Sequence, residues 1–225
     1  MTKQLFLLLF LFHFLILNRA ASADPDPLFD FCVAAPKSTH YPGHSPNFPN
    51  HPCKDPSNAT VEDFIYTLQS LSPENISAAG FSALAVGPSL FPGLNTLGMS
   101  FVRAEFARGA VNVPHFHPRA TELAYVLEGE IYSGFVDSNN RIFARILKNG
   151  EVMVFPKGLV HFQMNVGKGN AVIFGCFNSQ NPGLEKLPFT IFGSGIDGEL
   201  LEKAFGMSKG EVQKMSGRFG PKEIR

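Results

Sequence analysis

Short runs of apolar and aromatic residues dominate the middle of the chain and predict strands. They follow one another from about residue 80 and include "TLGMSFVRAEF", "AYVLEGEIYSGFV", "RIFARILKNGEVMVFP", "VHFQMNV" and "NAVIFGCF". Gly, Pro, Asn and Asp interrupt them about every 8–12 residues, and "VDSNNRI" has the composition of a hairpin turn. This spacing indicates an antiparallel sandwich or barrel, so the predicted fold class is all-β.

The end of the chain predicts two short amphipathic helices. The first, within "DGELLEKAF", has one apolar face formed by Leu200, Leu201, Ala204 and Phe205. In the second, Ser208 and Glu211 have the spacing of a capping box, and we expect the helix to run to about Ser216 and end at Gly217. Either a neighbouring subunit or the chain's own strands would cover the apolar face.

The segment before the strands predicts little regular structure. Residues 24–56 contain eight prolines, which exclude a helix or a central strand and indicate an extended arm. Its histidines, His40, His44 and His51, are scattered among these prolines, so we interpret them as loop residues rather than metal ligands. Residues 60–71 carry apolar side chains at helical spacing and predict one short helix.

The three cysteines leave one unpaired under any pairing. Cys32 and Cys53 flank the proline-rich segment and are the natural disulfide pair, although another pairing stays open. A loop of this size would stabilise the chain by roughly 3 kcal/mol in the chain-entropy model. Cys176 lies in the apolar run "AVIFGCF", which predicts a buried free thiol.

The first 23 residues have the pattern of a secretory signal peptide. A lysine precedes the apolar run Leu5–Leu17, and small residues stand at the two positions that a signal peptidase reads. The alternative is a membrane anchor, but the run is short of the roughly 20 residues that a spanning helix needs. A secreted protein beginning near Asp24 is expected, and the sequons at Asn58 and Asn75 are candidate N-glycosylation sites.

Charge argues against a nucleic-acid partner. Removal of residues 1–23 takes Lys3 and Arg19 and no acid, so 17 basic side chains remain against 19 acidic ones, a net charge of −2. The sequence has no polybasic run or basic cluster. The apolar composition indicates an ordered core rather than a disordered chain.

Candidate chemistry lies in "NVPHFHPRATELAYVLEG". Successive side chains on a strand alternate between faces, so His115 and His117 point the same way, about 7 Å apart. A turn at Pro118–Thr121 would bring the Glu122 carboxylate to the same place. A single His-x-His pair is weak evidence, because exposed histidines also occur by chance.

A fourth candidate ligand is His161, which follows the turn predicted at Pro156 and Gly158. Three imidazoles and one carboxylate suit a first-row divalent ion, and an octahedral ion would keep two positions open for a small molecule. Ligand types alone do not distinguish Mn from Fe, Ni, Cu or Zn.

The spacing of these residues resembles the two cupin boxes. The first reads Gly109, five residues, His115-Phe116-His117, four residues, Glu122, six residues, Gly129; the second reads Gly150, five residues, Pro156-Lys157-Gly158, two residues, His161, three residues, Asn165. Together with "DPDPLFDFCVA", "FPGLNTLG" and "FNSQNPG", they make the chain similar to plant germins and germin-like proteins over nearly its whole mature length.

The resemblance implies a cupin β-jelly-roll barrel, with Mn²⁺ held by His115, His117, Glu122 and His161. It also implies a homohexamer, a trimer of dimers clasped by the C-terminal helices, in the apoplast or cell wall. We therefore expect four segments: signal peptide 1–23, disulfide-tied arm with a short helix 24–78, barrel 79–195 and C-terminal helical oligomerisation segment 196–225.

Three activities stay open at this stage. Some germins are oxalate oxidases in which two asparagines orient the substrate; Asn112 matches one, whereas Val102 stands at the other position and cannot donate a hydrogen bond. Losing a donor to a charged group costs roughly 1.5–3 kcal/mol, so oxalate oxidation is disfavoured. Superoxide dismutation needs just an open, redox-active metal. A third reading is a wall or receptor-like protein in which the metal stabilises the barrel without turnover.

Overall fold

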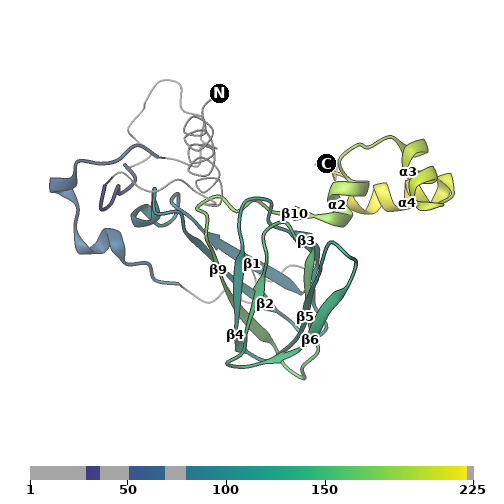
Figure 1. The fold of residues 1–225 in the computed structure, drawn as a ribbon, viewed down its shortest axis with the longest axis horizontal. Helices are drawn as coiled ribbons and strands as arrows, with labels where there is room; N and C mark the ends of the chain where they lie inside the picture. Colours follow the sequence, from purple (N-terminus) through teal and green to yellow (C-terminus); the bar gives the residue numbers. More distant parts are fainter. Residues whose placement is uncertain (1–28, 36–50, 69–79, 222–225) are drawn as a thin grey trace, which may run out of the picture.

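The computed structural model describes residues 29–35, 51–68 and 80–221. Its centre consists of two five-stranded antiparallel sheets, ordered β1-β2-β9-β4-β7 and β10-β3-β8-β5-β6, which face each other (Figure 1). The strands are β1 (Phe81–Val86), β2 (Ser100–Phe106), β3 (Val111–Phe116), β4 (Glu122–Glu128), β5 (Glu130–Val136), β6 (Ile142–Lys148), β7 (Val152–Phe155), β8 (His161–Asn165), β9 (Ala171–Phe177) and β10 (Glu185–Lys186). This is an all-β jelly-roll, as the sequence predicts.

Alternation along the strands separates a buried interior from an outer face. In β9, Ala171 and Ile173 face the interior and pack with Phe106 of β2 and Phe155 of β7 in one buried cluster. Outer residues of the same sheet such as Leu123 and Val154 stay exposed, because the other sheet covers one face alone. This apolar cluster fills one part of the barrel interior, while polar side chains gather in another.

The predicted hairpin is present between β5 and β6. Asp137 Oδ1 accepts hydrogen bonds from the backbone N–H groups of Asn139 and Arg141, and Asn140 adopts the left-handed conformation with φ of 60°. Asparagine tolerates this conformation better than most residues do, which explains its position in the turn.

The helix predicted over residues 60–71 is wrong in its described part. A single 3₁₀ turn, η3 (Val61–Phe64), follows the 3₁₀ turn η2 (Pro56–Asn58), and Ile65 is already extended. The reason is tertiary contact: the ring of Tyr66 stacks on Phe91, beside the 3₁₀ turn η5 (Pro92–Leu94), with centroids 5.5 Å apart. These contacts require an extended chain after Phe64 and outweigh the local helical pattern.

The predicted disulfide joins Cys32 to Cys53, and an isolated bridge pairs Ala34 with Cys53 beside it. Cys176 is free, as predicted, but half-buried rather than fully buried, because it lies on the outer face of β9 opposite Leu123. Asn58 is exposed.

The signal peptide, His40, His44 and Asn75 lie outside the described residues. Within the described part, no helix is both long and apolar enough to cross a membrane.

Three helices follow β10 and lie together to one side of the sheets (Figure 1). They are α2 (Leu187–Phe192), which the sequence analysis did not predict, α3 (Gly198–Phe205) and α4 (Lys209–Phe219). The capping box of Ser208 and Glu211 is formed. However, α4 passes Gly217 and ends at Gly220, because no left-handed residue interrupts it earlier.

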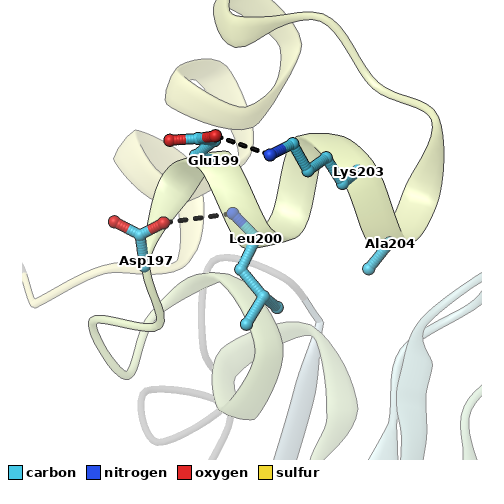
Figure 2. Close-up of a pocket in the computed structure, with 5 residues that line it drawn as sticks. All are labelled: Asp197, Glu199, Leu200, Lys203 and Ala204. Atoms are coloured by element: carbon cyan, nitrogen blue, oxygen red, sulfur yellow. Dashed lines mark hydrogen bonds and ion pairs between the residues drawn. The ribbon is translucent and has the colours of Figure 1, made fainter.

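The apolar face of α3 is covered in part. Leu201 is buried, whereas Leu200 and Phe205 remain 57% and 51% exposed. Figure 2 shows Leu200 beside a shallow pocket, with Asp197 capping the helix by accepting from the Leu200 N–H and Lys203 paired with Glu199 one turn away. In the described chain α3 packs on α4, while α2 contacts both α4 and β3, and the outer part of the α3 face stays exposed.

Candidate metal centre

The candidate ligands are brought together from both sheets. His115 lies near the end of β3 and pairs with His161 of β8 in antiparallel register, while Glu122 begins β4 in the opposite sheet. His117 lies one residue beyond β3, whereas the sequence analysis placed it on the same strand as His115, with the turn beginning at Pro118. The candidate ligand atoms of the four residues lie within 4.8 Å of one another, and all four side chains are buried.

Backbone carbonyls fix the orientation of all three imidazoles. A carbonyl can accept but not donate, so each Nδ1 carries the proton and each neutral ring keeps its lone pair on Nε2. The contacts are His115 Nδ1 to Val113 O at 2.7 Å, His117 Nδ1 to Gly183 O at 2.5 Å and His161 Nδ1 to Leu159 O at 2.9 Å. Outer contacts of this kind are typical of histidines that bind metals through the other nitrogen.

The inner nitrogens of the imidazoles converge on the Glu122 carboxylate or on Asn112, and one of them is left without a hydrogen bond. His117 Nε2 is buried and has no hydrogen-bond partner in the described part of the chain, although it lies 3.2 Å from Glu122 Oε2. His161 Nε2 lies 3.2 Å from the same oxygen. In the neutral form with the proton on Nδ1, both rings direct Nε2 lone pairs toward the carboxylate, and a cation between them would satisfy these atoms. The residues therefore fit a bound divalent metal.

Charge states within the group also suit a metal. Burial, together with the nearby His161, lowers the pKa of His115 to about 3, so this ring is neutral at neutral pH. For Glu122, burial acts to raise the pKa, but the imidazoles of His117 and His161 outweigh it and lower the pKa to about 2. A neutral imidazole and an ionised carboxylate are the forms that bind metals.

Gly175 of β9 makes room for the carboxylate, a role that sequence reasoning missed. It pairs with both Val102 of β2 and Ala124 of β4. A Cβ at this position would lie 2.7 Å from Glu122 Oε1 and 2.8 Å from Val102 Cγ1. Glycine therefore leaves room for the Glu122 carboxylate, and Val102 lies close to this candidate ligand.

A cavity of about 750 Å³ opens onto the group. Asn112 and Val102 both line it, as do Gln163 and Phe177. Asn112 Nδ2 donates to Gln163 Oε1 at 2.8 Å, whereas Asn112 Oδ1 is buried and has no hydrogen-bond partner in the described chain.

Gln163 was another residue that sequence reasoning missed. It lies two positions after His161 on the same face of β8, and the strand period of two could have found it.

Comparisons with known proteins agree with this architecture. Residues 68–213 match the cupin family, which defines the class of fold and site. The chain is 52% identical to germin-like protein subfamily 3 member 2 of Arabidopsis thaliana over 89% of this chain and 87% of that protein. It is 48% identical to germin-like protein 2-4 of Oryza sativa subsp. japonica over 95% and 93% of the two chains. The chain is thus a cupin and belongs to the plant germin-like proteins.

Solved structures of an oxalate oxidase, one of them in complex with the substrate analogue glycolate, are also similar to this chain. They share 38% sequence identity with it at a TM-score of 0.79 and cover 87% of this chain and 98% of theirs. The group of three histidines and one glutamate fits a cupin metal site.

Proposed function

We propose that this germin-like protein is a secreted manganese protein whose metal is reached by small molecules through the cavity. The observation that carries the proposal is the convergence of three imidazole groups and one carboxylate, of which His115, His117 and Glu122 line that cavity. His115, His117, Glu122 and His161 hold the ion. The choice of manganese rests on the resemblance to germins. A bound manganese ion would supply one-electron redox chemistry and a Lewis acid.

Oxalate is not the substrate that this site favours. Although the chain is similar to an oxalate oxidase, Val102 lies near the Glu122 carboxylate, at the position where the resemblance to oxalate-oxidising germins implies an amide side chain. Asn112 remains as a polar group beside the metal-binding residues, so it can orient a ligand. At the position of Val102, an apolar side chain thus stands in place of a hydrogen-bond donor.

Superoxide dismutation is the second candidate activity. It requires an open redox site and no dedicated pocket, and the cavity beside His115 and His117 provides access. The alternative without turnover, in a defence- or wall-related protein, uses the ion to join the two sheets, because a metal that binds the folded state alone stabilises it.

Assembly and location complete the proposal. Residues 1–23 direct secretion to the apoplast or cell wall, Asn58 and Asn75 carry glycans, and the exposed position of Asn58 is compatible with this. The segments are the arm 24–78, the barrel 79–195 and the helical segment 196–225. Other copies of the chain cover the exposed Leu200 and Phe205, giving a homohexamer built as a trimer of dimers.

The test uses protein purified from a plant secretory system. Elemental analysis should find about one manganese per chain. Peroxide release with oxalate should be absent, and superoxide loss in a gel assay identifies dismutase activity. Peroxide release from oxalate would contradict our interpretation of Val102, while a metal-loaded protein inactive in both assays would favour the structural role. Protein without any transition metal would overturn the proposal.

A further inference from the structure

Lys186 is placed beside the metal-binding residues by the register of β10. It pairs directly with His115 of β3 in an antiparallel arrangement. Side chains of directly opposite residues project to the same face of a sheet. Because the His115 side chain is buried inside the barrel, the Lys186 side chain is directed to the same side, and it lines the cavity.

The Lys186 side chain brings positive charge to this cavity. Its Nζ lies 5.7 Å from the ring centroid of Phe81, which also lines the cavity. Among the described residues, no carboxylate lies within ion-pair distance of Lys186. The cavity's carboxylate, that of Glu122, contacts His117 and His161. The ammonium group is therefore available to an anion that enters the cavity.

The other residues that line the cavity are largely apolar, and the cavity is wide. Val102, Ile173 and Phe177 line the cavity beside the metal-binding residues. Its volume of about 750 Å³ lies within the range of roughly 300–1,000 Å³ that is typical for drug-sized ligands. A two-carbon dianion such as oxalate would leave most of this space and the apolar walls without contacts.

We propose that the cavity binds a 2-hydroxycarboxylate that carries an apolar side group. Lys186 forms an ion pair with the carboxylate of this ligand. The ligand's hydroxyl and one carboxylate oxygen face the metal, and its apolar group packs against Val102 and Phe177. Lys186, on the sheet opposite Val102, thus supplies the charge-assisted donor that valine cannot. This inference rests on the proposed function, because the metal holds the oxygen end of the ligand.

The experiment compares two probes with the same head group. Glycolate and 3-phenyllactate are both 2-hydroxycarboxylates and differ by one benzyl group. Calorimetric titration of the manganese-loaded protein, with metal content measured first, should show at least ~10-fold tighter binding of 3-phenyllactate, because the benzyl group is buried. Val102→Asn should narrow this ratio by strengthening the binding of glycolate.

The charge of Lys186 is tested separately. Lys186→Met should weaken the binding of both probes by about 10- to 100-fold, whereas Lys186→Arg should retain most of the affinity. Lys168→Met, at an exposed loop position, should bind both probes like the wild type. Melting curves check the fold of each variant. If Lys186→Met does not fold, the Arg variant and the probe ratio still decide the question.

Three results would overturn this inference: equal affinity for the two probes, wild-type affinity in a folded Lys186→Met variant, or no binding of either probe to protein that carries its metal. Absence of metal would instead show that the proposed function itself has failed, so the two failures are distinguishable.

Discussion

The barrel interior and the C-terminal helices differ in what the single chain leaves incomplete. Inside the barrel, large apolar side chains such as Phe106 and Phe155 are buried, and the atom left without a partner is polar, the buried Nε2 of His117. On α3 and α4 the N-terminal caps are formed by side chains, and the apolar side chains of Leu200 and Phe205 remain exposed. The barrel thus offers a group that fits a metal ion, whereas the helices leave an exposed apolar face, which the proposed assembly would cover.

The largest expected effect is on metal binding. His117→Ala removes one of four ligands and should lower manganese affinity by more than about 100-fold, since even the loss of an outer-shell contact costs 10- to 100-fold. Elemental analysis after gel filtration measures the loss. His51→Ala is the matched control, because its backbone N–H, not its side chain, bonds to Asn95. Full metal content in the His117 variant would contradict the ligand assignment.

A smaller change tests the space behind the carboxylate. Gly175→Ala introduces a methyl group against Glu122 Oε1 and Val102, which should displace the carboxylate and weaken metal binding about 10- to 100-fold. Gly169→Ala, where a Cβ meets nothing within 4 Å, controls for the loss of glycine. Metal titration followed by the manganese spectroscopic signal distinguishes the two variants, and equal affinities would show that Gly175 has no such role.

The helices are tested by a change that should not affect the metal. Leu200→Lys places a charge on the exposed face of α3 and should shift the assembly toward smaller species in analytical ultracentrifugation, with metal content unchanged. Gln213→Lys adds the same charge at an exposed position of α4 and should preserve the assembly. Wild-type sedimentation of the Leu200 variant would show that α3 lies outside the subunit interface.

The smallest effect concerns the cap of α4. Ser208→Ala removes the hydroxyl that accepts from the Glu211 N–H and should cost about 1 kcal/mol of unfolding free energy. Chemical denaturation measures this loss. Ser216→Ala is the comparison, because the Gly220 N–H donates to the backbone carbonyl of Ser216, which the substitution keeps. A loss above about 3 kcal/mol would mean that the barrel depends on the helices more than their separate packing indicates.

The sequence predicted the elements whose local pattern and tertiary role agree. His115 and His117 could be placed on one face because the strand period fixes it, and the capping box of Ser208 needs only its own helix. The helix over 60–71 was wrong because the contact of Tyr66 with Phe91, over 20 positions along the chain, decides its path. No local pattern reports such a contact.

In the site, the candidate ligands could be predicted from the sequence, but the residues that surround them could not. The four candidate ligands carry recognisable chemistry and spacing. Gly175 and Lys186 became visible as neighbours of the site once the registers of β9 with β2 and of β10 with β3 were known. Both are ordinary residues in the sequence, and pairing between distant strands gives them their roles.

The most direct test of the account is anomalous diffraction at the manganese edge from crystals of the secreted protein. The account predicts one peak per chain, bounded by the Nε2 atoms of the three histidines and the carboxylate of Glu122. A peak elsewhere, or none in crystals grown with manganese in excess, would contradict it.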